Sequence, residues 1–427
     1  MKINELKKQI TDGVFDEKFS VLYDANAIIN QRERYTLALE SFAQLFGEDR
    51  DVNLYSVSGR SELAGNHTDH NCGKVIAASI NLDIIAVVSQ NTTNVINLKS
   101  DGYKMLSIDY NEYCVPNEKH FGTSASLIAG MCAGFREKGY QIGGFDSYCT
   151  SSVLRGSGLS SSAAFEDMIG NILSHEFNNG NIDNVEIAKL AQYSENVYFG
   201  KPCGLMDQVA CAYGGIVSID FEDTKNPIIE KIDFDLTKAG YNLCIVDTGG
   251  NHADLTDDYA SVPSEMKSVA EYFGKKVLRE CALSDVLSNA KEIRKECGDR
   301  ALMRAIHFFR ENERVDSMKQ TLSNGELDCY FAGVLESGRS SFNYLQNVYT
   351  TKNVEEQGLS LALCVTDRFM SGNKGAFRVH GGGFAGTIQA YVAEEDVELY
   401  RETMDSIFGE GACLVLRVRP YGAIKVN

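Results

Sequence analysis

The sequence predicts an α+β protein with two domains. Its 427 residues exceed the size of one ordinary domain. Segments with strand and helix patterns are mixed along the chain without regular alternation, which disfavours a single doubly wound sheet. A helix-dominated region starts near Pro263, and the last part of the chain returns to strands. We therefore expect an N-terminal domain over residues 1–225 and a C-terminal domain over residues 226–427.

The first domain is expected to contain both long strands and amphipathic helices. Segments rich in β-branched and apolar residues predict strands, and apolar residues at helical spacing predict helices. Asp183 and Glu186 form a capping-box pattern that opens one of these helices. The expected strands are 52–60, 74–90, 143–153 and 214–221, and the expected helices lie within the first 50 residues and at 124–139, 161–177 and 185–200.

The second domain is expected to place a block of helices between strands. A strand is predicted at 241–248 and helices from about Pro263 to Leu345. Three further strands are predicted at 375–380, 386–392 and 413–418. The chain has only five prolines, so no proline-rich linker marks the boundary.

Composition excludes several classes of protein. Hydrophobic residues make up 44% and charged residues 23%, as in a soluble globular protein. No apolar window reaches eighteen residues and the N-terminus does not resemble a signal peptide, so we expect a cytoplasmic protein. A net charge of −18 argues against nucleic acid or an anionic membrane as the main partner.

The cysteines are expected to be reduced. There are twelve of them, without a CxxC pair, and several stand singly in apolar segments, such as Cys132, Cys244 and Cys364. This usage is typical of buried thiols in a reducing compartment.

The stretch "RGSGLSSSAA" (Arg155–Ala164) lies between a predicted strand and a predicted helix. A helix N-terminus favours an anion, and Gly156 and Gly158 would allow the backbone to approach a phosphate closely. No Gly-Lys-Ser/Thr follows, so this is not a Walker A loop. Taken alone, the pattern leaves phosphate binding and a simple serine N-cap as alternatives.

Two other patterns do not predict what they first suggest. The segment "HGGGFAG" (His380–Gly386) matches GxGxxG, but a strand-like run follows where a dinucleotide site needs a helix. We interpret it as a glycine-rich hairpin. His67 and His70 form an HxxH pair without a third ligand at a suitable spacing, which disfavours zinc.

Four motifs in order resemble the galactokinase family of the GHMP small-molecule kinases: "SGRSELAGNHTDHNCG" (Ser58–Gly73), "RGSGLSSSAA", "GKPCGLMDQ" (Gly200–Gln208) and "GGGFAG". The resemblance spans most of the chain. It implies a ribosomal-S5-like N-terminal domain, a ferredoxin-like C-terminal domain and an active site between them. It also implies ATP and Mg²⁺, with transfer of the γ-phosphoryl group to the anomeric hydroxyl of a sugar.

The resemblance implies two catalytic residues. Asp207 matches the catalytic aspartate; it is ionised at neutral pH and can orient a hydroxyl and accept its proton. Arg60 matches the arginine that pairs with this aspartate and could stabilise the transferring phosphoryl group. Without the other motifs, Asp207 would be interpreted as an N-cap or a surface carboxylate, and Arg60 as a solvated side chain.

The phosphate and metal ligands are also implied by the matching motifs. Glu195 matches a carboxylate that ligates Mg²⁺, with Ser162 as the first candidate for a serine ligand and Ser161 as the second. The alternative for Glu195 is an ordinary solvent-facing helix residue. The residues expected to bind ATP are Arg155, Gly156, Ser157, Gly158, Leu159, Ser160, Ser161 and Ser162.

Five residues are implied as sugar contacts, namely Asn66, His67, Asp69, Gly204 and Tyr259. A core tyrosine is the alternative for Tyr259. Two departures bear on the choice of sugar: Asn66 stands where the family has glutamate, and Glu62 where it usually has asparagine. Ser58 and Ser61 also replace a proline and an apolar residue.

The resulting prediction is a sugar-1-kinase that converts galactose to galactose 1-phosphate. The alternatives are a kinase for a related sugar (an amino- or deoxy-galactose, or arabinose), a non-catalytic sugar and ATP sensor, and another GHMP enzyme such as a mevalonate or homoserine kinase. The intact "GSGLSSSAA" disfavours the sensor, and "NHTDH" with "CGLMDQ" disfavours the other enzymes. We expect a monomer or a weak dimer.

Overall fold

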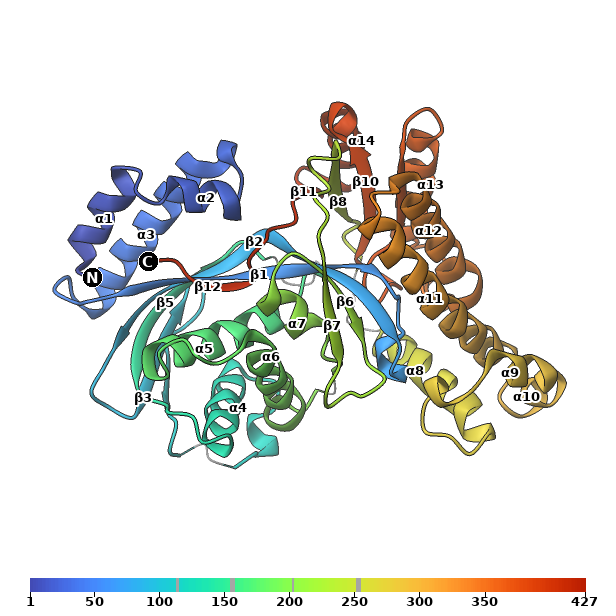
Figure 1. Ribbon diagram of the computed structural model, residues 1–427, viewed down its shortest axis with the longest axis horizontal. Helices are drawn as coiled ribbons and strands as arrows, with labels where there is room; N and C mark the ends of the chain where they lie inside the picture. The colour runs from blue at the N-terminus through green and yellow to red at the C-terminus, as the bar shows by residue number, and fades with distance from the viewer. Residues whose placement is uncertain (113–114, 154–157, 202, 251–254) are drawn as a thin grey trace.

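The computed structural model describes residues 1–112, 115–153, 158–201, 203–250 and 255–427. Two β-sheets, each covered by its own helices, lie side by side (Figure 1). The mixed helix-and-sheet class predicted from the sequence is confirmed.

The first sheet has eight strands among the described residues and is organised around one long central strand. Its order is β12-β1-β2-β5-β3-β4, with β6 paired to β2 and β7 paired to β6. β2 pairs with β1 along its length, while β6 and β5 pair with its two ends on the other side. The strands are β1 (Asn53–Ala64), β2 (Lys74–Gln90), β3 (Val95–Ser100), β4 (Leu106–Asp109), β5 (Phe145–Ser151), β6 (Ile216–Asp220), β7 (Ile228–Ile232) and β12 (Ala423–Lys425).

Helices cover both faces of this sheet. In β2, Ile84, Ala86 and Val88 enter one core, while Ile85 and Val87 enter the opposite one. This explains the continuous apolar run from Ile84 to Val88, since side chains on both faces are buried. One face packs against α4 (Ser124–Glu137), α5 (Ser161–Phe177), α6 (Asn184–Tyr193) and α7 (Met206–Tyr213), and the other against α1 (Ile3–Thr11), α2 (Asp16–Leu22) and α3 (Ile28–Phe46).

The second sheet is antiparallel, with the order β11-β8-β10-β9, and helices cover both of its faces. The strands are β8 (Tyr241–Asp247), β9 (Gly375–Val379), β10 (Thr387–Ala393) and β11 (Cys413–Leu416). One face packs against α11 (Asp299–Ser323) and α12 (Leu327–Ser340), and the other against α13 (Gly358–Met370) and α14 (Val397–Phe408).

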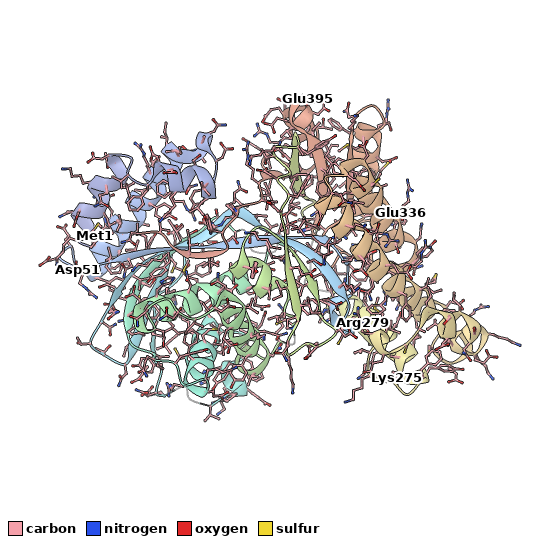
Figure 2. The ribbon with its side chains drawn as sticks, in the orientation of Figure 1. Met1, Asp51, Lys275, Arg279, Glu336 and Glu395 are labelled. Carbon is pink, nitrogen blue, oxygen red and sulfur yellow. The ribbon has the colours of Figure 1, made fainter. Side chains whose placement is uncertain are left out.

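A smaller helical extension has its own core against the first half of α11. It contains α8 (Thr256–Tyr272), α9 (Leu283–Ser288) and α10 (Ala290–Glu296). Arg279, labelled in Figure 2, donates to Asp220 at the end of β6 over 2.9 Å. This contact joins the extension to the first sheet.

Two strands beyond residue 225 pair in the first sheet rather than the second. β7 forms a hairpin with β6, and β12 pairs with β1. The chain thus returns to the first sheet at its C-terminal end, and the division at residue 225 stays a prediction.

Most of the expected elements are confirmed, and several others were not predicted. β2 and α5 have the predicted bounds, and the strand after "HGGGFAG" is β10. The strands and α-helices absent from the prediction are β3, β4, β7, β12, α7, α13 and α14. No disulfide links the described cysteines, but Cys364 is exposed on α13 rather than buried as expected. In the described part of the chain, no helix has the length and apolar character needed to cross a membrane.

Candidate active site

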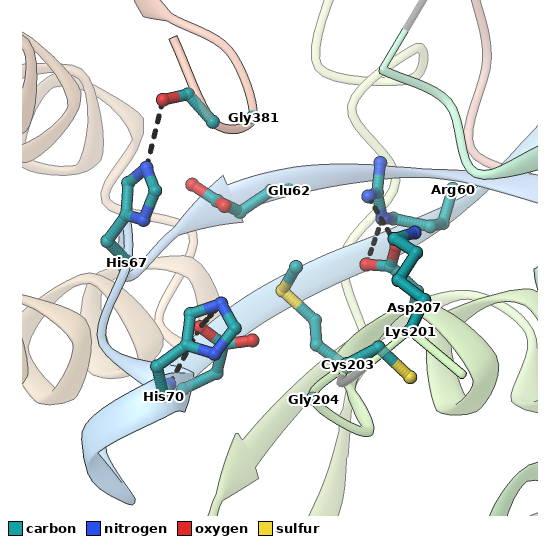
Figure 3. Close-up of a pocket in the computed structure, with 12 residues that line it drawn as sticks. Arg60, Glu62, His67, His70, Lys201, Cys203, Gly204, Asp207 and Gly381 are labelled. Carbon is teal, nitrogen blue, oxygen red and sulfur yellow. Dashed lines mark hydrogen bonds and ion pairs between the residues drawn. The ribbon is translucent and has the colours of Figure 1, made fainter. Parts of the chain in front are cut away.

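A cavity of about 210 Å³ lies where the first sheet and α7 meet the glycine-rich loop before β10 (Figure 3). Its wall is strongly polar, with three carboxylates, two histidines, an arginine and a lysine. The lining residues are Arg60, Glu62, His67, Asp69, His70, Lys201, Cys203, Gly204, Met206, Asp207, Gly381 and Gly382.

Arg60 and Asp207 form a bidentate ion pair in this wall. Arg60 Nε donates to Asp207 Oδ1 over 2.7 Å, and Nη2 donates to Oδ2 over 2.8 Å. Arg60 lies in β1 beside a register shift with β2, and Asp207 lies in the first turn of α7, where a helix favours negative charge. The Arg60 side chain is 8% exposed and that of Asp207 is 33% exposed, so the carboxylate is accessible from the cavity.

The same pair is bound to the serine-rich turn. Ser160 Oγ donates to Asp207 Oδ2, and Arg60 Nη1 donates to the carbonyl oxygen of Gly158. The backbone N–H of Arg60 also donates to the carbonyl of Leu159 over 3.1 Å. Asp207 therefore lies between the cavity and the N-terminus of α5.

The charge state of Asp207 follows from these contacts. Burial alone would raise the pKa of its carboxyl group. The Arg60 guanidinium, the Ser160 hydroxyl and the charge of Lys201 outweigh burial and hold the pKa below its usual range. Asp207 is consequently an ionised hydrogen-bond acceptor at neutral pH.

The expected phosphate-binding residues are only partly within the described chain. Ser161 and Ser162 are the first two residues of α5, and Ser160 adopts a left-handed backbone conformation just before them. Arg155, Gly156 and Ser157 lie outside the described residues. A helix of seventeen residues begins at this turn, so its free N–H groups face the region next to Asp207.

Glu195 lies near the Arg60–Asp207 ion pair, in a π-helical turn (Ser194–Phe199) that follows α6. Its side chain is buried, with Oε1 3.0 Å from Lys201 Nζ and Oε2 accepting from Gln208 Nε2 over 3.0 Å. Gln208 also donates to Glu166 Oε2 over 3.3 Å. Because Gln208 follows Asp207 directly, one amide connects Glu195 to the start of α7.

The residues around Glu195 fit a hard cation in their chemistry. Glu166 Oε1 and Gln208 Oε1 are buried and have no hydrogen-bond partner in the described part of the chain. Such oxygens, with serine hydroxyls, are the ligands that Mg²⁺ prefers. Within the described residues no three His, Cys, Asp or Glu side chains form a complete metal site, so other ligands would have to complete the coordination.

His67, Asp69 and Gly204 lie together on the other side of the cavity. His67 Nε2 donates to the carbonyl of Gly382 over 2.9 Å, and burial lowers the pKa of His67 to about 4, so its imidazole is neutral with Nδ1 as an acceptor. A Cβ on Gly204 would lie 2.4 Å from Asp69 Oδ2. Glycine at 204 therefore allows Asp69 to keep its position.

The structure does not bring Asn66 and Tyr259 to the cavity wall. Asn66 is fully buried; its amide nitrogen donates to Gly381 O over 2.7 Å, and its amide oxygen accepts from Asn347 Nδ2 over 2.8 Å. The Tyr259 hydroxyl donates to Gly383 O over 2.8 Å, and its ring packs edge-on against Phe384. Both side chains support the loops around the cavity, because their polar groups are bonded to protein atoms.

Glu62 lines the cavity instead. In the sequence it stood out as a departure that bears on the choice of sugar, but it was not among the expected sugar contacts. The replacement of a usual asparagine by a carboxylate was visible in the sequence. What the sequence did not reveal is that Glu62 and Asn66 are in contact, with Asn66 Nδ2 3.2 Å from Glu62 Oε1.

Comparisons with known proteins show which family the chain is similar to. Residues 126–215 match the family described as "GHMP kinases N terminal domain", and residues 40–90 match the "Galactokinase galactose-binding signature". Galactokinase of Clostridium tetani is 30% identical over 375 residues, which cover 87% of this chain and 91% of the relative. Galactokinase of Streptomyces coelicolor is 29% identical over 381 residues, 89% of this chain and 94% of the relative.

The fold is also similar to a solved structure. The crystal structure of Lactococcus lactis galactokinase complexed with galactose matches with a TM-score of 0.77 at 23% identity. The match covers 92% of this chain and 100% of that chain. At this level of identity the comparison establishes the shared fold.

Proposed function

Because this chain belongs to the galactokinase family of the GHMP kinases, we propose that it transfers the γ-phosphoryl group of ATP to the anomeric hydroxyl of a sugar, with galactose as the first candidate. One observation carries the proposal. The ionised carboxylate of Asp207 faces the cavity and is bonded at the same time to the serine-rich turn before α5. An acceptor hydroxyl and a phosphate could therefore meet at this side chain.

Asp207 would act on the sugar hydroxyl. A hydroxyl in the cavity would donate a hydrogen bond to the carboxylate, which orients the oxygen lone pair toward the γ-phosphorus. As the new O–P bond forms and the bond to the ADP oxygen breaks, the hydroxyl proton passes to Asp207. Asp207 would either remove the proton completely or mainly position the hydroxyl. Both roles need its ionised carboxylate.

Arg60 would keep Asp207 ionised and in place. Its two parallel hydrogen bonds fix the carboxylate plane, and its charge lies close enough to the turn to stabilise the phosphoryl group during transfer. An arginine that is already ordered needs no reorganisation in the transition state. Positioning and charge stabilisation of this kind are the main contributions of a protein to phosphoryl transfer.

The nucleotide would lie on the other side of this pair. We assign its phosphates to the turn of residues 155–162 and to the N–H groups at the start of α5. Glu195 and Ser162, or Ser161, would hold Mg²⁺, which when bound neutralises charge on the phosphates. Lys201 pairs with Glu195 over 3.0 Å, so it would have to move when a metal ligates that carboxylate.

The sugar would be held by His67, Asp69 and the backbone at Gly204. Neutral His67 can accept a hydrogen bond at Nδ1, and Asp69 is an acceptor. We assign Asn66 and Tyr259 a supporting part, since their polar groups hold Gly381 and Gly383 of the glycine-rich loop.

A panel of free sugars tests the proposal. Galactose, galactosamine, deoxy-galactoses and arabinose are incubated with MgATP, ADP release is measured, and the product phosphate is located by NMR. Galactose should give the highest kcat/KM, with phosphate on C1. If the protein prefers another sugar of the panel, that sugar is assigned as the substrate instead of galactose. Release of ADP no faster than without sugar, for every member of the panel, would overturn the assignment as a sugar kinase.

A further inference from the structure

Glu62 is a second carboxylate in the cavity wall, on the same strand as Arg60. The two residues are two positions apart in β1, so both side chains leave the same face of the strand. Figure 3 shows Glu62 extending toward the cavity between His67 and Arg60. It therefore lies away from Asp207, on the side where the rest of a bound sugar would be.

The two oxygens of Glu62 have different environments. Oε1 accepts from Arg378 Nη2 over 2.5 Å and from Asn66 Nδ2 over 3.2 Å. Oε2 has no hydrogen-bond partner among the described residues, and it is not one of the atoms closed off from solvent. The carboxylate thus presents one unused acceptor to the cavity.

The Glu62 side chain is held rigidly. Arg378 is fully buried, and it also donates to the Glu62 carbonyl over 3.1 Å and to Ser337 Oγ over 3.1 Å. Asn66 is fixed in turn by Gly381 and Asn347. A side chain with 5% exposure and this support has little freedom to turn its free oxygen elsewhere.

The chemistry of this oxygen limits what it can bind. Burial raises the pKa of Glu62, and Arg378 opposes that rise. In the ion pair with Arg378 the carboxylate is a hydrogen-bond acceptor, so its ligand must be a donor. Because Arg378 already balances the charge of Glu62, a neutral hydroxyl is favoured over a second cation such as the ammonium of an amino sugar. A ligand without a donor there would leave the acceptor desolvated and unpaired, which is costly.

We propose that Glu62 is a specificity-determining residue, whose free oxygen accepts a hydrogen bond from one sugar hydroxyl other than the one that is phosphorylated. This inference rests on the proposed function and deepens it, because it makes the substrate a neutral sugar with a hydroxyl at that position. The corresponding deoxy sugar is rejected.

Deoxy sugars combined with a substitution test the inference. The kcat/KM values of galactose and of its 2-, 3-, 4- and 6-deoxy analogues are measured for the wild type and for Glu62→Gln. Analogues that lack a hydroxyl held by His67 or Asp69 should be poorer substrates than galactose. In the wild type, the analogue that lacks the hydroxyl bound by Glu62 should also be poorer, by roughly 10- to 100-fold, the effect of one hydrogen bond to a charged group. In Glu62→Gln that ratio should fall to about a few-fold, with the ratios of the other analogues unchanged within about twofold.

Glu311→Gln is the matched control. Glu311 is a buried carboxylate of the same network that accepts from Ser337 Oγ over 2.5 Å and does not line the cavity. Its substitution should lower stability without changing the pattern of hydroxyl preference. If Glu62→Gln reduced kcat/KM by the same factor for all five sugars, Glu62 would have only a structural role and the inference would be wrong.

Two further measurements keep the outcomes separate. If Glu62→Gln does not fold, the double exchange Glu62→Asn/Asn66→Glu keeps one carboxylate and one amide in contact, and it should weaken the same single preference. An unchanged preference in that variant would contradict the inference. Better turnover of galactosamine than of galactose would overturn the neutral hydroxyl as the ligand, whereas no turnover of any sugar by the wild type would overturn the proposed function itself.

Discussion

The Arg60 guanidinium binds the Asp207 carboxylate through two parallel hydrogen bonds of 2.7 and 2.8 Å, although the residues are 147 positions apart in the sequence. The pair lies between the cavity and the serine-rich turn, so it connects the two regions in which we propose that sugar and nucleotide bind.

Asp207→Asn should abolish turnover. An amide keeps the shape of the side chain but cannot accept the hydroxyl proton, so kcat should fall by about 10²- to 10⁴-fold. Affinity for ATP should stay within a few-fold, measured by direct nucleotide binding. Asp299→Asn, which changes an exposed carboxylate, is the control. Near-normal rates in the ADP-release assay would remove Asp207 from the mechanism.

Arg60→Lys should lower kcat more than it raises the KM for sugar. Lysine keeps the charge but loses the planar fork, so the carboxylate is held less firmly. Because Arg60 lowers the pKa of Asp207, the substitution should raise it, and the active ionised form would then be lost at higher pH. The acid limb of the kcat profile should therefore move upward. A change confined to KM would count against this role.

Gly204→Ala should weaken sugar binding selectively. The new Cβ would lie 2.4 Å from Asp69 Oδ2, and the carboxylate would have to move. We expect the KM for sugar to rise by about tenfold or more, as for the loss of one hydrogen bond to a charged group, with little change for ATP. Gly372→Ala is the control, because a Cβ there meets no atom within 4 Å. Equal effects of the two substitutions would show that Asp69 does not position the sugar.

Asp83→Asn should destabilise the whole protein. Asp83 is fully buried and accepts from Tyr23 over 2.5 Å, from Arg34 over 2.6 Å and from Arg419 over 3.3 Å. Removing its charge leaves two arginines without their partner, which costs about 3–5 kcal/mol of the free energy of unfolding. Urea denaturation measures this loss. Asp316→Asn, at an exposed pair with Lys74, should cost less than about 1 kcal/mol.

His380→Gln should reduce the acid sensitivity of the fold. Burial first, and then the charges of Arg60 and Arg378, hold the pKa of His380 well below its usual range. The unfolded state takes up a proton below about pH 6.5 and the folded state does not, so stability falls as the pH falls through that value. Without this histidine, the slope of unfolding free energy between pH 6.5 and 5 should shrink by up to about 1.4 kcal/mol per pH unit.

Urea denaturation at several pH values checks this prediction. His70→Gln, which replaces an exposed histidine, is the control. An identical slope in wild type and His380→Gln would show that this imidazole is not held neutral by the fold.

The fold was predictable where a pattern was long. β2 and α5 each have seventeen residues, β2 rich in β-branched and apolar residues and α5 with apolar residues at helical spacing, and both were predicted with their bounds. β12 has three residues and β4 has four, too few to show a period, and their positions depend on pairing with distant strands.

The residues of the candidate site could be predicted from local sequence motifs, but their contacts with distant residues could not. The resemblance identified Arg60 and Asp207, but no spacing rule pairs residues so far apart. The sequence could not predict that Glu62 rather than Asn66 lines the cavity. The chain turns at Gly65, with φ of +95°, and this turn puts Asn66 behind the cavity. Such a turn is set by packing against Lys74 and Val75, which lie outside the motif.

The return of the chain to β12 affects how the protein matures on the ribosome. β1 and β2 of the first sheet are complete at residue 90, yet the edge beside β1 stays open until residues 423–425 have been synthesised. Val426 N–H then donates to Leu54 O over 2.7 Å, which closes that edge. The first sheet therefore stays incomplete while the rest of the chain is translated. A ribosome that stalls before residue 423 would leave a sheet with an exposed edge strand, which favours aggregation.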